Sequence, residues 1–341
     1  MRIFSGIQPT GAKHLGNYIG AIRQYVASQE QGDDAFFCIV DLHSITVEYD
    51  PADLRESTLS LAALLFAAGL HPERSTIFVQ SHVPAHPEAA WLLGSVTSFG
   101  ELRRMTQFKD KADAQEFVSA GLFTYPVLQA ADILLYRTEI VPIGEDQRQH
   151  LELARDVAER FNARFGETLT VPKAVFAEVG AKIMDLQEPE KKMSTTGGTA
   201  QGTVLVLDPP DTIRRKFRSA VTDSGREVVR APEKPGISNL IEIMAVARGE
   251  EPEAVETRYD GQGYGAFKTD VGDAVVELFD PIRRAYEELR GDETELQRML
   301  ARGAEKARKA SEPVLEEMYD RMGFVKARTG RMFGAARPRG L

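Results

Sequence analysis

Residues 2–17 have the sequence RIFSGIQPTGAKHLGN. The apolar residues of Arg2–Ile7 predict a β-strand, Pro9 and Gly11 favour a turn, and a helical pattern starts at about Leu15. Glycines at a strand-to-helix turn let the backbone come close to a ligand, and unpaired N–H groups at the start of a helix attract phosphate. The stretch therefore predicts a nucleotide-binding βα unit, although an ordinary tight turn would have the same glycine and proline content.

The rest of the first half repeats this alternation of strands and helices. The predicted helices run from about Leu15 to Gln29 and from Pro51 to Gly69, and Asp50 is a good capping residue directly before the second. Such alternation is typical of a parallel sheet covered by helices, so we expect a Rossmann-like, doubly wound α/β fold. The predicted strands are Arg2–Ile7, Ala35–Asp41, Ser75–Gln80 and Glu139–Ile143.

From about residue 237 onward only helical patterns remain. They predict an all-helical C-terminal domain after the α/β domain. Small and polar residues at 197–202 predict a mobile loop between the two parts. The predicted C-terminal helices are Ile237–Arg248, Val271–Leu289 and Glu295–Met322.

The composition is that of an ordinary globular protein, with 341 residues, 43% hydrophobic residues and a net charge of −9. A net negative charge argues against indiscriminate nucleic-acid binding. The charge is uneven, because residues 321–341 contain six basic side chains and no acid. Two further basic clusters could equally be solvated helix faces. They are Arg214, Arg215, Lys216 and Arg218, and Arg302, Lys306, Arg308 and Lys309.

The single cysteine, Cys38, lies in an apolar run and is predicted to be buried. It excludes an internal disulfide and favours a reducing compartment. Without an apolar stretch of about 18 residues or a signal-peptide pattern, the chain is expected to be cytoplasmic.

Three further side chains, two histidines and the single tryptophan, are not assigned to a functional site. His82 and His86 are four residues apart, but neighbouring prolines and the lack of a cysteine cluster argue against a structural zinc site. Trp91 is predicted to be a core residue.

A second stretch whose residues could take part in catalysis is KKMSTTGG at residues 191–198. A lysine on a mobile loop can stabilise the charge that develops on phosphates in a transition state. Taken alone, the stretch could also be a solvated surface loop. Together, His14–Asn17 and Lys192–Thr196 resemble the HIGH-like and KMSKS-like signatures of class I aminoacyl-tRNA synthetases.

The chain resembles the bacterial tryptophanyl-tRNA synthetases of that class from about residue 2 to about residue 322. The resemblance rests also on segments 4–11, 125–134, 144–147 and 219–224. It implies that L-tryptophan is activated with ATP to tryptophanyl-adenylate and pyrophosphate. The tryptophan is then transferred to the 3′-terminal adenosine of tRNA(Trp), and AMP is released.

The resemblance also implies a division into four segments. Residues 1–185 would form the Rossmann-like catalytic domain for ATP and tryptophan, 186–203 a mobile KMSKS-like loop, 204–325 a helical anticodon-binding domain, and 326–341 a basic, flexible tail. Proteins of this family are homodimers, so a homodimer is expected. Neither DNA nor a membrane is an expected partner.

The implied reaction needs no general base in its first step, because the attacking carboxylate is already ionised. Catalysis then rests on positioning and on stabilisation of phosphate charge, with Mg²⁺ held mainly by the ATP phosphates and no metal site on the protein. The implied catalytic residues are Lys192, Lys111, Gln8 and Thr10. The implied ATP-binding residues are Gln8, Pro9, Thr10, His14, Gly16, Asn17, Gly144, Glu145, Asp146, Ile183, Lys192, Met193, Ser194, Thr195 and Thr196.

Tryptophan recognition centres on Asp132. A carboxylate among apolar neighbours is costly to bury without a donor, and the resemblance supplies the indole N–H of tryptophan as that donor. Without it, Asp132 could be an exposed residue on a polar helix face, and His43 could be a core histidine. The implied tryptophan-binding residues are Asp132, Tyr125, Phe4, Val40, His43, Gln147, Val141 and Ile143.

One position departs from the family signature, because Thr195 stands where a second lysine is usual. Thr196 also replaces a serine. Loss of a contact made in the transition state can cost about 3 kcal/mol. Either Lys109 or Lys111 compensates, or the activity is weak.

Three other functions fit parts of the sequence. A tyrosyl-tRNA synthetase shares both signatures, and a weakly catalytic paralogue that binds RNA or a protein partner would explain Thr195. A small cofactor adenylyltransferase also uses a histidine-containing βα turn, but it would leave the helical half unexplained.

Overall fold

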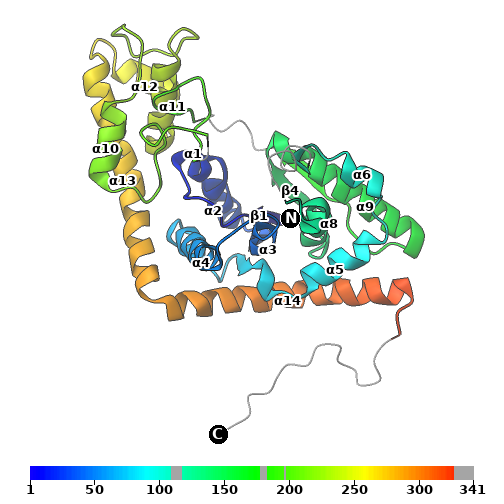
Figure 1. Ribbon diagram of the computed structural model, residues 1–341. Coiled ribbons are helices and arrows are strands. Elements are labelled where there is room, and N and C mark those ends of the chain that lie inside the picture. The colour runs from blue at the N-terminus through cyan, green and yellow to red at the C-terminus, as the bar shows by residue number, and fades with distance from the viewer. Residues whose placement is uncertain (109–116, 177–182, 196, 326–341) are drawn as a thin grey trace.

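The computed structural model describes residues 1–108, 117–176, 183–195 and 197–325 (Figure 1). Its centre is a sheet in the order β3-β2-β1-β4-β5, in which every neighbouring pair is parallel. The strand order reverses between β1 and β4, which defines a doubly wound fold. The predicted Rossmann-like fold is confirmed. The strands are β1 (Arg2–Ile7), β2 (Asp34–Ile39), β3 (Thr76–Val79), β4 (Ile140–Ile143) and β5 (Lys173–Phe176).

Alternate residues of the central strands point to opposite faces of the sheet and enter separate cores. Phe37 and Ile39 of β2 belong to one core, whereas Phe36 and Cys38 belong to the other. This period of two follows from strand geometry, and burial of both faces is usual for parallel sheets. Cys38 is buried, as predicted.

Helices from the first half cover both faces of the sheet (Figure 1). Side chains of α4 enter the core that contains Phe37, and side chains of α5, α8 and α9 enter the core that contains Phe36. Asp50 caps α4, accepting hydrogen bonds from the backbone N–H groups of Ala52 and Asp53 at 2.7 and 3.2 Å. These helices are α4 (Pro51–Ala67), α5 (Ala85–Gly94), α6 (Phe99–Arg103), α8 (Ala120–Leu134) and α9 (Arg148–Phe165).

The predicted strands are confirmed with small shifts at their ends, but three details differ. The predicted helix 15–29 is interrupted: α1 (Leu15–Asn17) leads into a π-helical turn, η1 (Tyr18–Ile22), before α2 (Arg23–Glu30). β5 was not predicted, because it is a short edge strand without clear alternation. The prediction for Trp91 is wrong, since its side chain is 84% exposed on α5.

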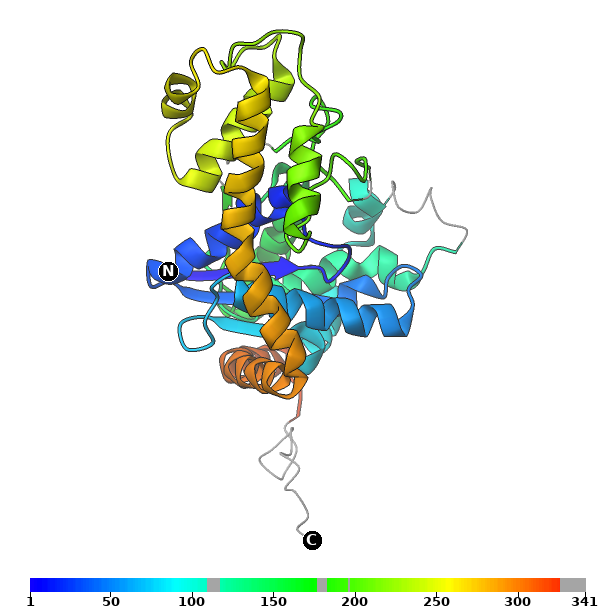
Figure 2. The same ribbon diagram turned by 90° about the vertical axis from the view of Figure 1, so that its left-hand side faces the viewer.

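The C-terminal part is helical, as predicted, and its two longest helices run along two sides of the α/β part (Figures 1 and 2). The helix α13 passes from α10 and α11 to α4, and the chain then turns at Asp292 into α14, which packs along β3 and α5. The helices are α10 (Pro210–Arg218), α11 (Pro235–Arg248), α12 (Pro252–Arg258), α13 (Tyr264–Gly291) and α14 (Glu293–Met322).

The contact of α14 with the sheet is unusually close. A Cβ atom on Gly303 would lie 1.7 Å from the carbonyl oxygen of Ile77, so only glycine permits this approach. The basic cluster of α14 strengthens the contact: the guanidinium of Arg308 donates to the carbonyl of His82 at 2.7 and 3.0 Å, and Lys306 donates to that of Pro72 at 2.5 Å. Part of the predicted 204–325 segment is thus attached to the α/β part, and the domain boundary itself stays a prediction.

Candidate active site

The carboxyl ends of four parallel strands meet at one edge of the sheet. The first residues after β1, β2, β3 and β4 are Gln8, Val40, Gln80 and Gly144, respectively. Ligands bind at this edge in doubly wound sheets, near the point where the strand order reverses. Three short helical turns follow here: α3 (Asp41–Ser44), η2 (Gln80–His82) and η3 (Glu145–Gln147).

A cavity of about 700 Å³ opens at this edge. Gln8, Gly144 and Glu145 of the predicted ATP set line it, together with all the side chains of the predicted tryptophan set. That set comprises Phe4, Val40, His43, Tyr125, Asp132, Val141, Ile143 and Gln147.

The helix α8 presents three polar side chains to the cavity. Tyr125, Gln129 and Asp132 are spaced four and three residues apart, which places them on one face of a helix. Ser119 caps the helix by accepting the N–H of Leu122 at 3.0 Å.

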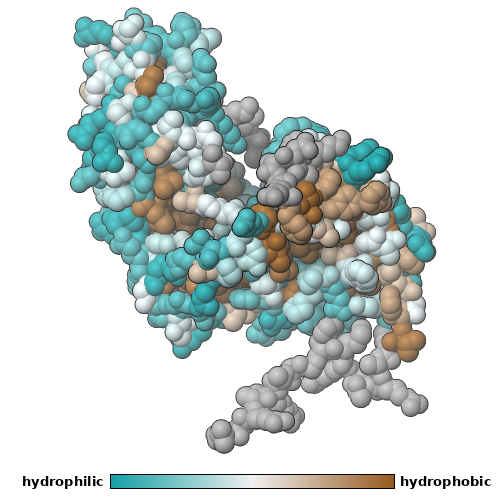
Figure 3. All heavy atoms as spheres, viewed as in Figure 1, coloured by the Kyte–Doolittle hydropathy of each residue, from teal (hydrophilic) through white to brown (hydrophobic). Residues whose placement is uncertain are grey.

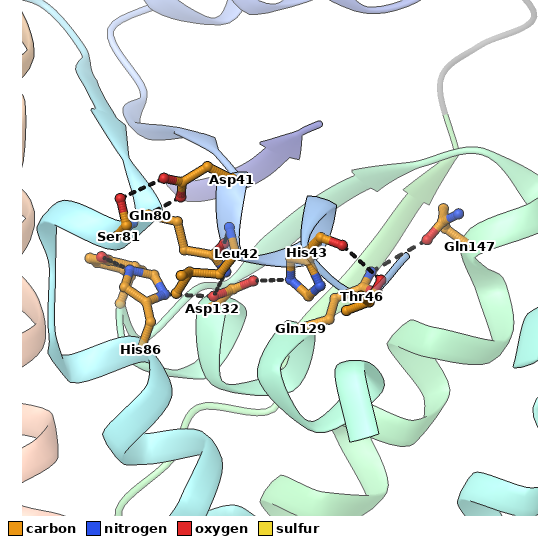
Figure 4. Close-up of polar contacts among 11 residues, drawn as sticks. Asp41, Leu42, His43, Thr46, Gln80, Ser81, His86, Gln129, Asp132 and Gln147 are labelled. Carbon is orange, nitrogen blue, oxygen red and sulfur yellow. Dashed lines mark hydrogen bonds and ion pairs between the residues drawn. The ribbon is translucent and has the colours of Figure 1, made fainter. Parts of the chain in front are cut away.

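Asp132 lies at the centre of a buried hydrogen-bond network (Figure 4). Its side chain is 1% exposed. Gln80 donates to Oδ1 through Nε2 at 2.7 Å, the Nδ1 atom of His86 lies 2.6 Å from the same oxygen, and the Nε2 atom of His43 lies 2.8 Å from Oδ2. Burial alone would raise the pKa of Asp132, but the hydrogen bonds from His43 and His86 outweigh it and hold the pKa well below its ordinary value. The carboxyl group is therefore an ionised acceptor.

The sequence did not reveal Gln80 and His86 as parts of this site. His86 was considered only as a metal ligand, whereas it lies in the first turn of α5 and binds Asp132. The requirement for donors around a buried carboxylate was the available signal, but it does not say which residues supply them. Their positions become clear only when β3 is placed beside β2.

Tyr125, Gln129 and Gln147 form the polar end of the cavity. Burial raises the pKa of Tyr125 to about 12, and its hydroxyl lies 2.7 Å from Nε2 of His150. Gln129 donates to the amide oxygen of Gln147 at 3.4 Å. These groups would suit the amino and carboxyl groups of an amino acid.

The HIGH-like signature forms a cap at the start of α1. His14 Nδ1 accepts the backbone N–H of Asn17 at 3.3 Å, and the Asn17 side chain accepts the N–H of His14 at 3.1 Å. Burial, with smaller contributions from Lys192 and Lys13, lowers the pKa of His14 to about 4, so the ring is neutral at pH 7.

The two signatures lie side by side in the structure. The N–H of Leu15 donates to the carbonyl of Val204 at 2.8 Å, and a Cβ on Gly16 would lie 3.6 Å from Cβ of Ile183. The N–H of Met193 donates to the carbonyl of Ile183 at 3.0 Å. A Cβ on Gly11 would lie 3.3 Å from Oγ1 of Thr195.

The glycines that follow the second signature are required by close packing, in addition to the mobility predicted for this loop. The buried carboxylate of Asp185 accepts the N–H groups of Gln187 and Thr199 at 2.8 and 3.0 Å. A Cβ on Gly202 would lie 1.7 Å from its Oδ1, and one on Gly198 would lie 2.9 Å from its Oδ2. The small residues let the loop close around this carboxylate, and its mobility stays a prediction.

Lys13 supports the first turn from inside. Its Nζ donates to the carbonyl oxygens of Gln8 and Thr10, both at 2.9 Å, and burial lowers the pKa of Lys13 to about 8. Bonds to these two carbonyls fix the backbone of the turn.

The two carboxylates of the predicted ATP-binding set, Glu145 and Asp146, are exposed, and Glu145 lines the cavity. Arg148 binds Glu145 through two hydrogen bonds of 2.7 and 2.9 Å, and Gln147 donates to Asp146 at 2.9 Å. Such exposed pairs contribute little to stability, so a ligand could replace them. Lys109, Lys111 and Thr196 lie outside the described residues.

Comparisons with known proteins agree with this architecture. Residues 1–280 match the family described as tRNA synthetases class I (W and Y). The tryptophan–tRNA ligase 2 of Streptomyces avermitilis is 54% identical over 332 residues, 96% of this chain and 98% of that protein. The tryptophan–tRNA ligase of Caldanaerobacter subterraneus subsp. tengcongensis is 51% identical over 325 residues, 95% of this chain and 98% of that protein.

A solved structure has the same fold over nearly the whole chain. The tryptophanyl-tRNA synthetase of Campylobacter jejuni, complexed with ADP and tryptophan, has a TM-score of 0.84 and 36% sequence identity. The match covers 95% of this chain and 100% of that chain. With its doubly wound sheet and paired signatures, the chain belongs to the class I tRNA synthetases for tryptophan and tyrosine. Within that family it is a tryptophan–tRNA ligase, and the tyrosyl alternative is not favoured.

Proposed function

We propose that the chain binds L-tryptophan in the cavity around Asp132 and ATP along the two signatures. A carboxylate oxygen of tryptophan attacks the α-phosphorus of ATP, which forms tryptophanyl-adenylate and releases pyrophosphate. The adenylate then passes its tryptophanyl group to the 3′-terminal adenosine of tRNA(Trp), and AMP leaves.

One observation carries the choice of substrate: an ionised, buried acceptor that lies beside apolar walls of the cavity. Of the donors from the described residues, two bind Oδ1 of Asp132 and one binds Oδ2. A carboxylate oxygen has about two acceptor positions, so Oδ2 keeps one for the indole N–H. Phe4, Val141 and Ile143 supply the apolar walls.

The phosphate chemistry falls to the turn Gln8–Asn17 and to Lys192. Gln8, Thr10 and the N-terminus of the first helix would hold the triphosphate, and Lys192 would stabilise the charge on the departing pyrophosphate. Ile183, beside Gly16, would cover the adenine. Lys111 would supply the second cation that Thr195 does not provide.

Mg²⁺ would arrive on the ATP phosphates. In the described part of the chain, no group of three or more His, Cys, Asp or Glu side chains could enclose a metal ion. This fits the preference of Mg²⁺ for phosphate oxygens and water with few protein ligands. When bound, the ion would neutralise phosphate charge.

The experiment that tests this function is ATP–pyrophosphate exchange with tryptophan and with tyrosine, followed by aminoacylation of tRNA(Trp). We expect exchange that depends on tryptophan and is at least a thousandfold weaker with tyrosine, of the order set by a polar recognition site. Absence of tryptophan-dependent exchange would favour the alternative of a paralogue that only binds RNA or a protein.

Contact with tRNA would use the basic residues of α10 whose side chains have no acidic partner among the residues that the structure describes. Lys216 is buried and donates to Asp208 and to the carbonyl of Thr203, and Arg214 pairs with Asp273. Arg215 and Arg218, in contrast, are exposed on α10. We therefore place the phosphate contacts on these two arginines, and their replacement by Ala should weaken tRNA binding without changing exchange.

A homodimer would cover the exposed apolar side chains of the catalytic part. Apolar residues gather over the α6 and α8 side in Figure 3, whereas the surface over α10–α13 is mostly hydrophilic. The exposed fractions are 84% for Trp91, 67% for Phe99 and 79% for Phe117. Patches of this kind usually mark protein interfaces. Light scattering should give twice the mass of one chain, and Phe99→Glu should lower the measured mass toward that of one chain.

A cytoplasmic location accords with the proposed reaction on tRNA.

A further inference from the structure

The carboxylate of Asp132 is oriented by residues that lie behind the cavity. Gln80 and His86 bind Oδ1 and do not line the cavity, whereas His43 binds Oδ2 and does line it. The protein therefore uses Oδ1 for anchoring and leaves acceptor capacity on Oδ2. The question is what holds His86.

His86 connects Asp132 to a second buried side chain, Tyr136. The ring of His86 is 0% exposed, and its Nε2 lies 2.7 Å from the hydroxyl oxygen of Tyr136. An ionised carboxylate only accepts hydrogen bonds, so Nδ1 of His86 carries the hydrogen that Asp132 receives. The other ring nitrogen, Nε2, is held by the hydrogen bond with the hydroxyl of Tyr136, so both sides of the ring are fixed.

Tyr136 is fixed by aromatic neighbours and reaches the C-terminal helix. Its ring lies 4.6 Å from that of Phe36 and 5.6 Å from that of Phe4, which also lines the cavity. Burial raises the pKa of Tyr136 well above its ordinary value, so the hydroxyl keeps its proton. Ser311, a buried residue of α14, acts in the opposite direction and lowers the pKa of Tyr136, so its hydroxyl lies close to that of Tyr136.

The position of Ser311 is set by contacts on both sides of it along α14. Gly303 lies against the carbonyl of Ile77, and Arg308 binds the carbonyl of His82. Tyr319 donates to Glu88 at 2.6 Å. These contacts attach α14 to β3, η2 and α5, the elements that carry or adjoin Gln80 and His86.

We propose that Ser311, Tyr136 and His86 are positioning residues that transmit the placement of α14 to the Asp132 carboxylate and thereby sharpen recognition of an indole N–H. The inference rests on the proposed role of Asp132 as the indole acceptor. The hydrogen bonds of Tyr136 with His86 and of His86 with Asp132 lie in series, and hydrogen bonds in such buried networks polarise and strengthen one another.

The test uses an analogue that differs from tryptophan only at the recognised atom. In β-(benzothiophen-3-yl)alanine sulfur replaces the indole N–H, so the ratio of kcat/KM for tryptophan to that for the analogue in ATP–pyrophosphate exchange measures recognition of the N–H. Tyr136→Phe should lower this ratio by about tenfold, and Ser311→Ala by roughly threefold, as expected for loss of one buried hydrogen bond. The matched control is Tyr259→Phe, which removes a tyrosine hydroxyl that donates to Asp270 at 2.9 Å within the C-terminal helices and should leave the ratio unchanged.

The outcomes distinguish a failure of the proposed positioning role of Ser311, Tyr136 and His86 from a failure of the proposed role of Asp132. If Asp132→Ala abolishes the preference for tryptophan while Tyr136→Phe and Ser311→Ala keep it in full, the proposed chain is overturned and the role of Asp132 survives. If Asp132→Ala also keeps the preference, both fail. Should Tyr136→Phe not fold, as judged by its thermal unfolding, Ser311→Ala alone decides.

A spectroscopic readout tests the contact between Tyr136 and His86. Tyr136→Phe should shift the ¹⁵N signal of Nε2 of His86 more than that of Nδ1, because Nε2 lies 2.7 Å from the hydroxyl that is removed. An Nε2 signal that Tyr136→Phe does not move would overturn the proposed role of Tyr136.

Discussion

The two sides of the site are constructed in different ways. Around Asp132, buried side chains from α3, η2, α5 and α8 complete one another's hydrogen bonds. Around the turn Gln8–Asn17, backbone groups dominate, and loop and turn are joined by bonds such as that between Leu15 and Val204. A rigid side-chain network suits discrimination between amino acids, whereas a backbone cradle with a few cations suits phosphates.

The largest effect should come from the side-chain network. Asp132→Ala removes the acceptor for the indole N–H, so discrimination against phenylalanine should fall by about 10⁴-fold. The measurement is the ratio of kcat/KM values in ATP–pyrophosphate exchange. Asp132→Asn, which can still accept through its carbonyl, should retain part of the discrimination. Full discrimination in Asp132→Ala would show that the pocket is assigned wrongly.

Substitutions around the turn Gln8–Asn17 and its cations should lower the rate of the reaction and leave its specificity for tryptophan unchanged. Lys192→Ala removes a cation at the departing pyrophosphate and should lower the exchange rate by about a hundredfold, with the tryptophan preference intact. The neighbouring Lys191 is the control, because it pairs with Glu188 at 2.6 Å and is 65% exposed. Lys191→Ala should stay close to the parent protein; equal losses in both variants would contradict the assignment.

A second cation is expected to matter at the same place. If Lys111 compensates for Thr195, Lys111→Ala should lower tryptophan-dependent exchange by about a hundredfold. Introducing the missing lysine with Thr195→Lys should then restore much of that loss. Near-normal exchange in Lys111→Ala would dispose of the compensation.

The attachment of α14 should affect stability before activity. Gly303→Ala forces a methyl group against the carbonyl of Ile77 and should lower the free energy of unfolding by about 1–3 kcal/mol. Gly291→Ala is the control, since its Cβ would meet nothing within 4 Å. Denaturant titration checks both, and equal stabilities would show that α14 adjusts without strain.

The smallest effect concerns Lys13 beneath the turn. Lys13→Met keeps the length of the side chain and removes the bonds to Gln8 and Thr10, so the KM for ATP should rise about five- to tenfold. Because the pKa of Lys13 is lowered to about 8, its charge is present below pH 8 and is lost above it. The KM of the parent protein should therefore rise above pH 8. If the KM of Lys13→Met for ATP rises in the same way above pH 8, the pH dependence belongs to another group.

The sequence was informative where local chemistry decides the structure. Strand β1 and the cap at Asp50 follow from patterns of two to four residues, whereas most residues that line the cavity were expected from the family resemblance. His86 and Gln80 could not be assigned, because their function depends on β3 lying beside β2. Trp91 was misjudged because a helix pattern does not tell which apolar residues face an unfilled surface.

The helix α14 also determines when the fold is complete during synthesis. It packs along β3, whose residues precede it by more than two hundred positions in the chain. A nascent chain that has not yet released residues 293–322 from the ribosome leaves that side of the sheet without its cover. Fragments that end before this helix would expose apolar surface to water and become targets for chaperones and proteases. The cover of β3 is therefore among the last parts of the fold to be synthesised.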